Sequence, residues 1–499
     1  MRLMQLLSFY PQLRLGQGPE REIKGLTNDS RQVQEGWVYV AIRGNQFDGH
    51  KFIPQVCASG AAALIVEDDR LIPKDYQGAV VVVESTRAAL DQLAARYFGQ
   101  PAEKLFCVGV TGTNGKTSTT YMVEAILNRF GWPTGVLGTI NHHFGEHVWD
   151  AQLTTPDPLV LQKRLAEFRA LGAGAVAFEV SSHALTQNRV DQLPFDVAVF
   201  TNLTRDHLDY HHTMEEYFAA KERLFHEVLA TSSKPRTWAV VNADDPWSAR
   251  LKIADQAKLW TYGQKAADFR FTLGRQDFTG SEFNLKTPRG EQTIHLPLPG
   301  LHNVYNATAA IAVGLAAGAS LETCAQAIAE FNGVPGRLER VPDPGGLNIF
   351  VDYAHTDDAL KVVLNALNEV RRLAGLQNRI ITVFGCGGDR DKGKRPLMAQ
   401  AAVAGSDLVF VTSDNPRTEK PEAIIADCVA GLAPALISNT VFTEVDRGAA
   451  IGRALQSAQT GDVILIAGKG HEDYQIVGTE KRPFSDGEVV REWLKANRK

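Results

Sequence analysis

The sequence contains few cysteines, and their spacing argues against two common kinds of site. Its five cysteines stand at positions 57, 107, 324, 386 and 428, so no two of them form a C-x-x-C pair. Scattered cysteines of odd number argue against a disulfide framework and against a zinc knuckle, and they are typical of a reducing compartment. The sequence therefore predicts a cytoplasmic location.

Long apolar runs and an excess of either charge are also absent. The longest uncharged run of small apolar residues, 307–319, is too short to cross a bilayer and predicts a buried helix. The N-terminal stretch lacks the small-residue cleavage site of a signal peptide, so we expect no leader segment. The net charge of −5 gives no electrostatic reason to expect nucleic acid or a membrane surface as a partner.

The 499 residues are enough for about three domains. From residue 105 onward, short apolar runs alternate with helical patterns, as in a parallel sheet flanked by helices. Two stretches rich in glycine and proline, "FGQP" and "FNGVPGRLE", mark boundaries. We predict an α/β fold of three α/β domains, at residues 1–100, 101–335 and 336–499, the central one with a parallel sheet and the last one Rossmann-like. In residues 268–298, polar and apolar residues alternate between turn signals, which predicts an antiparallel appendix.

The strongest local signal is "LFCVGVTGTNGKTSTTYMVEAILNRFG", where an apolar strand runs into a glycine-rich turn and then a helix. Glycines let successive backbone N–H groups face an anion, and the helix N-terminus adds its dipole. Lys116 would reach the β- and γ-phosphates of a nucleotide, and the Thr117 hydroxyl would bind Mg²⁺. Val110 stands where this motif has a glycine, and the alternative is a plain connection between strand and helix. The predicted phosphate-binding residues are Gly112, Thr113, Asn114, Gly115, Lys116, Thr117 and Ser118.

Six further boxes accompany this loop: "LTTPDP", "EVSSHAL", "TNLTRDHLDYH", "HNVYNATAA", "GRLE" and "VDYAHT". Their combination and order resemble the Mur ligase family, ATP-dependent amide-forming enzymes of peptidoglycan precursor synthesis, over essentially the whole chain. The resemblance implies an N-terminal domain for a uridine nucleotide substrate, a central ATP-binding domain and a C-terminal domain for an amino acid. Folylpolyglutamate synthases share the phosphate loop and the central fold, but they do not usually carry an N-terminal domain of this kind.

The resemblance also implies a chemistry in which a carboxylate attacks ATP to give an acyl phosphate, which an amine then attacks. Two Mg²⁺ ions would help to bring the anions together. Thr117 and Glu179 would bind one ion and His207 the second, while Lys221 would be carbamylated by CO₂ and bind metal through the carbamate. From pattern alone, Glu179 is a strand-end acid, His207 a turn-capping histidine and Lys221 a solvated lysine on an amphipathic helix. The implied catalytic residues are Lys116, Glu179, His207 and Lys221.

Further ATP contacts are implied outside the phosphate loop. Asn303 and Asn306 share one helix face and resemble adenine-side contacts of the family. Arg337 and Asp352 resemble contacts to the γ-phosphate and the ribose, so closure of domains would assemble the site. Asp357 stands where the family usually has proline, and aspartate suits the first turn of a helix equally well.

The implied first substrate is a UDP-muramoyl dipeptide. Its uridine-diphosphate part would be bound by the boxes "LTNDSR" and "RGNQFDG", and its muramoyl-dipeptide part by the central domain. Without the resemblance, turn chemistry and strand-end hydroxyl groups explain these residues equally well. The implied contacts are Asn28, Ser30, Asn45, Gln46, Phe47, Thr154, Thr155, Ser181, Gln187 and Arg189.

Three loops that follow apolar strands in the last domain, "GCGGDRDKGKRP", "SDNPR" and "AGKGHEDYQ", are expected at one sheet edge. Arginine offers a fork to a carboxylate, and acidic side chains suit an ammonium group. The "DNPR" box is similar to that of family members that add meso-diaminopimelate, although Asn-Pro alone predicts only a turn. The implied amino-acid contacts are Arg390, Asp414, Asn415, Pro416, Arg417, Gly468 and Glu472.

Other functions stay open at this point. A lysine-adding ligase of the same family differs in the amino acid it accepts, and a folylpolyglutamate synthase would act on folates. A P-loop regulator without ligase chemistry would release phosphate independently of an acceptor amine. We expect a monomer whose partners are small molecules.

Overall fold

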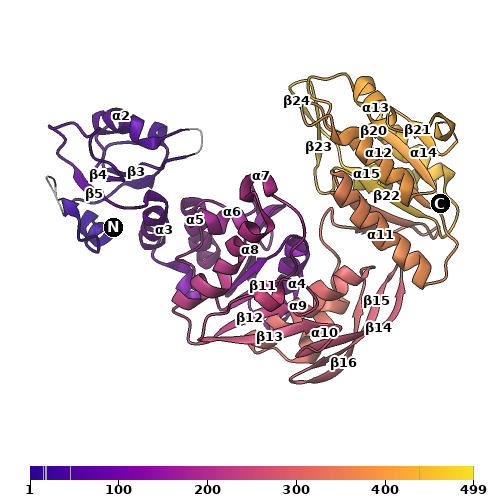
Figure 1. Cartoon of the computed structure of the whole chain (residues 1–499), viewed down its shortest axis with the longest axis horizontal. Helices are drawn as coiled ribbons and strands as arrows, with labels where there is room; N and C mark the ends of the chain where they lie inside the picture. The colour runs from indigo at the N-terminus through magenta and orange to yellow at the C-terminus, as the bar shows by residue number, and fades with distance from the viewer. Residues whose placement is uncertain (15, 17–19, 45–46, 438, 498–499) are drawn as a thin grey trace. The chain divides into compact units, whose positions relative to one another are not determined.

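The computed structural model describes residues 1–14, 16, 20–44, 47–437 and 439–497 (Figure 1). They form two compact units, the first of Met1–Phe269 with Ala309–Ser320 and the second of Arg270–Thr308 with Leu321–Lys499. The domain boundaries at residues 100 and 335 stay predictions. Within the described ranges, no helix combines the length and the hydropathy needed to cross a membrane.

The N-terminal part of the first unit is a small sheet in the order β1-β5-β4-β3-β2. Strands β2 to β5 are parallel, as expected where buried β-branched runs such as "AVVV" alternate with helices. Strand β1 is antiparallel to β5. Its strands are β1 Leu13–Arg14, β2 Gly25–Thr27, β3 Trp37–Val40, β4 Ala63–Val66 and β5 Ala79–Val82. Its helices are α1 Leu3–Leu7, α2 Ile53–Ala58 and α3 Thr86–Tyr97.

The rest of the first unit is built on a larger sheet in which β6 lies between β10 and β11. Strands β7, β10, β6, β11, β12 and β13 are parallel in that order, and β8 and β9 continue the β7 edge antiparallel. The strands are β6 Phe106–Thr111, β7 Thr134–Leu137, β8 Asn141–Phe144, β9 His147–Asp150, β10 Ala175–Glu179, β11 Val197–Phe200, β12 Thr237–Asn242 and β13 Ala257–Gly263. The helices are α4 Lys116–Phe130, α5 Pro158–Ala170, α6 Ser182–Thr186, α7 Leu208–His211 and α8 Met214–Arg223.

The second unit begins with the predicted antiparallel appendix, in which β15 pairs with both β14 and β16. Helix α9 (Leu301–Ala317) runs across the division between the units, and α10 packs on β16. The elements other than α9 are β14 Phe269–Asp277, β15 Gly280–Thr287, β16 Gly290–Leu296 and α10 Leu321–Ala329.

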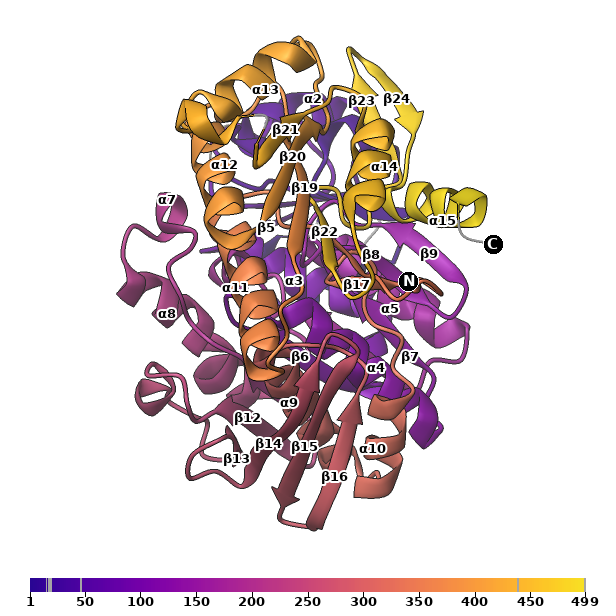
Figure 2. The same ribbon diagram turned by 90° about the vertical axis from the view of Figure 1, so that its right-hand side faces the viewer.

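The remainder of the second unit is a six-stranded sheet in the order β17-β18-β22-β19-β20-β21, parallel except for β17 (Figure 2). Two apolar cores cover its faces: α11, α12 and α13 pack on one side, and α14 and α15 on the other. The strands are β17 Glu339–Val341, β18 Asn348–Asp352, β19 Ile380–Cys386, β20 Leu408–Ser413, β21 Val441–Thr443, β22 Val463–Ala467, and the separate hairpin β23 Tyr474–Val477 with β24 Glu480–Pro483. The helices are α11 Asp357–Leu373, α12 Lys394–Gly405, α13 Pro421–Val429, α14 Arg447–Ser457 and α15 Asp486–Asn497. The predicted Rossmann-like arrangement is confirmed.

A buried carboxyl group connects α3 with the segment between α6 and β11. Asp91 on α3 is 1% exposed and accepts a hydrogen bond from the Gln192 backbone N–H at 2.8 Å. Burial raises the pKa of Asp91 from 3.8 to about 8, and the nearby charge of Asp191 adds to this effect. The folded protein therefore keeps this proton at pH values where the unfolded chain has released it.

Stability should fall as the pH rises from about 4 to 8, because unfolding then releases the Asp91 proton. The slope from this group is expected to be about 1.4 kcal/mol per pH unit at most. Asp91→Asn, which cannot ionise, should remove this slope. Urea unfolding midpoints measured from pH 5 to 8 test this, with the exposed Asp75→Asn as control. Parallel pH profiles for the wild type and Asp91→Asn would contradict it.

Candidate active site

The glycine-rich loop leaves the carboxyl end of β6, the strand between β10 and β11. Gly112 and Gly115 have φ values of +148° and +85°, which residues other than glycine rarely adopt. A Cβ atom on Gly112 would lie 1.9 Å from Thr201 Oγ1, so this position has no room for a side chain. The backbone N–H groups of Thr113 and Asn114 donate to Asn202 O and Asn202 Oδ1, each at 2.9 Å. The "TNLT" box therefore fixes the loop, and α4 begins directly after it.

Two lysines meet at this loop. Lys116 Nζ donates to the carbonyl oxygens of Gly112 and Thr113 at 2.9 and 2.7 Å, and Lys221 Nζ donates to Gly112 O at 2.8 Å. Lys221 is 1% exposed, so it is not the solvated lysine that its amphipathic helix predicts. Burial holds the pKa of Lys221 well below its usual range, and the charge of Lys116 lowers it further, against a smaller opposing effect of Asp206. This environment favours a neutral amine.

Glu179 is the last residue of β10, which pairs directly with β6. Its carboxylate is 1% exposed and accepts hydrogen bonds from Thr139 N at 2.9 Å and from Thr139 Oγ1 at 3.0 Å. Thr139 Oγ1 also lies 3.1 Å from Thr154 Oγ1, and Thr155 Oγ1 donates to Glu179 O at 2.7 Å. Two predicted contacts to the first substrate therefore lie beside this carboxylate.

The other central residues predicted for the first substrate join the same network. The Ser181 backbone N–H donates to Thr155 Oγ1 at 3.0 Å, and Ser181 Oγ caps α6. Arg189 donates to Thr155 O at 2.8 Å and to Gln187 Oε1 at 2.6 Å. Gln187 Nε2 lies 3.3 Å from Tyr210 Oη. The structure thus gathers Thr154, Thr155, Ser181, Gln187 and Arg189 at the carboxyl end of β10.

The predicted metal ligand His207 belongs to a histidine cluster. Its φ is +53°, its ring centroid lies 5.0 Å from that of His183, and burial lowers its pKa. His211 Nε2 lies 2.9 Å from Ser182 Oγ, and burial lowers the pKa of His211 to about 4. Sequence reasoning assigned no role to His183 or His211, although both stand in the quoted boxes. Among the residues that the structure describes, no group of three or more His, Cys, Asp or Glu side chains is arranged to hold a metal ion.

The described residues among those predicted for uridine diphosphate lie at the carboxyl edge of the small sheet. Asn28 and Ser30 follow β2, and Phe47, which is 73% exposed, lies in the loop after β3. Because β2 and β3 are parallel neighbours, both loops leave the sheet at the same edge. Asn45 and Gln46 lie outside the described residues.

The remaining predicted ATP contacts lie in the second unit. Asn303 and Asn306 are buried on the first turns of α9, and Asn303 Nδ2 donates to Pro299 O at 2.8 Å. The Arg337 guanidinium lies over the Tyr353 ring, 5.3 Å from its centroid. Asp352 accepts hydrogen bonds from the backbone N–H groups of Leu338 and Ala354 at 2.7 and 2.8 Å, and burial raises its pKa. Asp352 therefore fixes the turn that carries Arg337.

That turn packs backbone to backbone against the loop after β22. A Cβ atom on Gly336 would lie 2.2 Å from His471 N and 2.7 Å from Gly470 Cα. Gly336 O accepts a hydrogen bond from Tyr353 N at 2.9 Å. Position 336 therefore requires glycine for its close approach as well as for its φ of +66°.

The loops after β20 and β22 meet around a buried lysine that sequence reasoning missed. Lys469 Nζ is fully buried and lies 3.2 Å from Asp414 Oδ1, 3.2 Å from Asn415 Oδ1 and 3.1 Å from Glu472 Oε2. Its three N–H groups thus match three acceptors. Gly468, with a φ of +115°, completes the turn, and a Cβ there would lie 3.6 Å from Asp414 Oδ2. A lysine between two glycines in "AGKGHE" was the available signal.

Arg417 is held by the other loops of the same edge. Its φ is +51°, its backbone N–H donates to Ile476 O, and its side-chain NH1 donates to Gly388 O at 2.8 Å. The preceding Pro416 fixes the backbone before this unusual conformation. Arg390 is exposed, and its NH1 lies 3.5 Å from Asp389 O. The structure therefore gathers six of the seven predicted amino-acid contacts, with Arg390 at the exposed side of the loop after β19.

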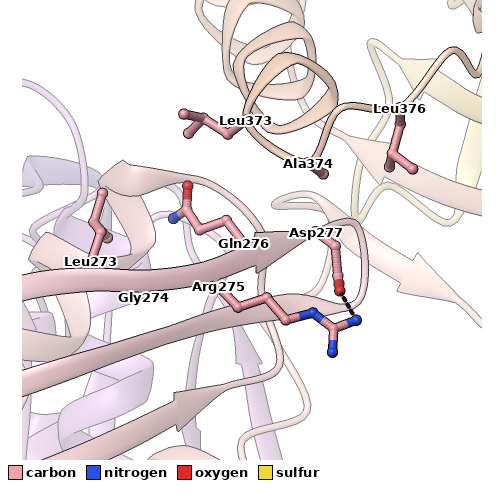
Figure 3. A pocket seen from close by; sticks show the side chains of 8 residues that line it. All are labelled: Leu273, Gly274, Arg275, Gln276, Asp277, Leu373, Ala374 and Leu376. Carbon is pink, nitrogen blue, oxygen red and sulfur yellow. Dashed lines mark ion pairs between the residues drawn. The ribbon is translucent and has the colours of Figure 1, made fainter.

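A separate cavity of about 540 Å³ in the second unit lies between β14 and the end of α11 (Figure 3). An ion pair of 2.6 Å joins Arg275 and Asp277 at its wall. None of the predicted site residues lines this cavity, whose lining is Leu273, Gly274, Arg275, Gln276, Asp277, Leu373, Ala374 and Leu376.

A glycine loop after the central strand, a lysine at the start of the following helix and a carboxylate at the end of the adjacent strand define a P-loop enzyme that uses a nucleotide. The chain belongs to the Mur ligase family, which comprises ATP-dependent ligases that form amide bonds in peptidoglycan synthesis. Residues 22–98 match the Mur ligase family catalytic domain, residues 110–314 the Mur ligase middle domain, and residues 336–470 the Mur ligase glutamate ligase domain.

Full-length relatives share this family and a common printed name. The UDP-N-acetylmuramoyl-L-alanyl-D-glutamate–2,6-diaminopimelate ligase of Geobacter sulfurreducens is 47% identical over 484 residues, which cover 94% of each chain. The ligase of the same name from Geobacillus thermodenitrificans is 44% identical and covers 100% of both chains. A solved structure of a ligase of that name has a TM-score of 0.74 at 33% identity and covers 100% of this chain and 99% of its own.

Proposed function

We propose that this chain joins meso-diaminopimelate to UDP-N-acetylmuramoyl-L-alanyl-D-glutamate, with ATP converted to ADP and phosphate. The observation that carries the proposal is the convergence of Asp414, Asn415, Arg417 and Glu472 at one sheet edge. The relatives' shared name supports it. We also propose that the protein acts as a monomer in the cytoplasm, where nucleotide substrates are available.

The proposed reaction has two steps. A carboxylate oxygen of the muramoyl dipeptide attacks the γ-phosphorus of ATP, ADP leaves, and an acyl phosphate forms. The amine nitrogen of diaminopimelate then attacks the acyl carbon, phosphate leaves, and the nitrogen loses a proton. Lys116 would neutralise phosphate charge in the first step. The loop 112–118 would hold the phosphates through backbone N–H groups other than those of Thr113 and Asn114, which donate to Asn202.

The oxygen donors among the proposed metal ligands suit Mg²⁺, which prefers oxygen. Thr117 on the first turn of α4, the helix that follows β6, and Glu179 at the end of the neighbouring β10 would supply a hydroxyl and a carboxylate. The neutral Lys221 amine is the form that reacts with CO₂, and the resulting carbamate would add two oxygens beside the loop. His207 would serve a second ion. Bound Mg²⁺ supplies charge neutralisation between carboxylate and phosphate.

The proposed substrate contacts form one group for ATP and another for the uridine nucleotide and its dipeptide. For ATP these contacts are the loop residues with Asn303, Asn306, Arg337 and Asp352. For the uridine nucleotide they are Asn28, Ser30, Asn45, Gln46 and Phe47, and for its dipeptide Thr154, Thr155, Ser181, Gln187 and Arg189. The hydrogen bonds of Thr155 and Arg189 support the dipeptide assignment, because they connect it to the Glu179 strand end.

For the amino acid, we propose that Arg417 binds the distal carboxylate of diaminopimelate, with Arg390 beside it. Asp414 and Glu472 each use one carboxylate oxygen for Lys469, and their second oxygens would accept from the substrate ammonium group. Asn415, Pro416 and Gly468 shape the same loops. Asp414, Glu472 and Lys469 together carry one net negative charge, which suits a cationic amine.

The deciding experiment measures ADP release with ATP and the muramoyl dipeptide nucleotide against a panel of amino acids. Release that depends on meso-diaminopimelate supports the proposal. Release that depends on lysine identifies the lysine-adding reaction, and activity on folates identifies a folylpolyglutamate synthase. Release without any acceptor amine would favour a P-loop regulator.

Lys221→Ala should lower kcat by about 10²-fold or more, because no carbamate can then place negative charge beside the phosphate loop. Added bicarbonate should not restore activity. A carbon-13 signal after exposure to labelled CO₂ should be present in the wild type and missing in the variant. The exposed Lys252→Ala serves as control and should keep both rate and signal. An unmodified Lys221 in fully active protein would contradict the carbamate.

A further inference from the structure

A second buried ion pair lies behind the amino-acid loops of the second unit. Arg447, the first residue of α14, and Asp486, the first residue of α15, are both fully buried. Arg447 Nε donates to Asp486 Oδ1 and Arg447 NH2 to Asp486 Oδ2, each at 2.7 Å, so the two groups form a bidentate fork.

The remaining hydrogen bonds of Arg447 go to two strand ends. Its NH1 donates to Ser413 O at 3.3 Å and its NH2 to Ala467 O at 3.0 Å. Ser413 ends β20 and directly precedes Asp414, while Ala467 ends β22 and directly precedes Gly468. One guanidinium therefore bridges the two carbonyls from which the amino-acid loops start, across the intervening strand β19.

Stability does not explain this arrangement well. A positive charge at a helix N-terminus opposes the helix dipole, and a buried ion pair can often be replaced by apolar groups without loss of stability. Burial opposes the charge of Arg447, but Asp486 raises the pKa of the guanidinium above its usual range, with smaller contributions from Asp414 and Glu472.

We infer that Arg447 and Asp486 form a positioning pair for the amino-acid site, holding the ends of β20 and β22 at the spacing that recognition of the acceptor requires. This inference rests on the proposed function of the loops that follow these strands. The pair touches no substrate itself, so its loss should alter binding of the amino acid and leave the two nucleotide substrates unaffected.

The test uses the double variant Arg447→Met with Asp486→Leu, which keeps the volume of the pair and removes its hydrogen bonds to the strand ends. We expect kcat/KM for meso-diaminopimelate to fall about 10–100-fold through KM, as for a site displaced by about 1 Å. KM values for ATP and the muramoyl dipeptide nucleotide should stay within about twofold. Arg447→Lys keeps the charge without the fork and should give a smaller shift in the same KM, so it carries the test if the double variant does not fold.

The matched control is the ion pair of Arg379 and Asp462, which are 2.6 Å apart. The two residues directly precede β19 and β22, so they lie at the amino ends of these strands, away from the amino-acid loops. Replacing it with methionine and leucine should lower Tm without a selective rise in KM for diaminopimelate. A fall in Tm with unchanged KM in the Arg447 variants, or an equal rise of all three KM values, would overturn the inference. Failure of the proposed function looks different, because the wild type would then show no diaminopimelate-dependent ADP release.

Discussion

Replacing Lys116 with alanine is expected to lower kcat for ligation by about 10³-fold while leaving the fold intact. The lysine begins α4 and its ammonium lies against the Gly112 and Thr113 carbonyls of the phosphate loop. Without it, the negative charge that builds up on the transferring phosphoryl group loses a cation at short range. The loop itself should survive, because Asn202 holds its backbone independently.

The measurement is kcat with saturating substrates, together with Tm and the dissociation constant for ATP. Lys104→Ala, an exposed lysine before the same central strand, is the matched control and should change none of the three. A Lys116→Ala variant with normal melting and a near-normal rate would refute the phosphate role.

Arg417→Ala should also have a large effect, a loss of roughly 200–5,000-fold in kcat/KM for meso-diaminopimelate. If the guanidinium binds a buried carboxylate, its removal costs about 3–5 kcal/mol. Lysine has the amines but lacks the distal carboxylate, so its poor reaction should decline much less. Arg417→Lys should not restore selectivity, because an ammonium cannot reproduce the planar fork.

The hydrogen bond from Arg417 NH1 to Gly388 O makes a competing explanation concrete, since the side chain also supports a neighbouring loop. Measuring kcat/KM for both amino acids separates the two roles. Equal proportional losses for diaminopimelate and lysine would mean that Arg417 only holds the loop. Arg482→Ala, an exposed residue of the adjacent hairpin paired with Glu480, should leave both values unchanged.

The features that sequence predicted well are those written in neighbouring residues. The phosphate loop follows from glycines between an apolar strand and a helix, and the acceptor loops follow from strands that end in polar boxes. Helix starts are equally local: Thr356 caps α11 through the Ala359 N–H, and Asp357 occupies its first turn as expected. Parallel pairing then brings distant loops to one edge without any further information.

The features that sequence could not predict depend on partners far along the chain. Lys221 reads as a solvated lysine because its partner, the Gly112 carbonyl, lies 109 positions away. Lys469 and Asp414 are separated by 55 positions, and Arg447 and Asp486 by 39. No periodicity within α8 or within the acceptor loops records such contacts. Only the folded arrangement shows which charged residues are buried, and against what.

The backbone contact between Gly336 and Gly470 has a thermodynamic consequence. It leaves too little space for one segment to shift alone, so the turn bearing Arg337 and the loop bearing Lys469 and Glu472 should move together. Any free energy by which an amino acid at the loop strengthens binding at Arg337 must then appear, with equal size, as stronger amino-acid binding when Arg337 is engaged. A single glycine would thus couple the affinities of two chemically unrelated substrates.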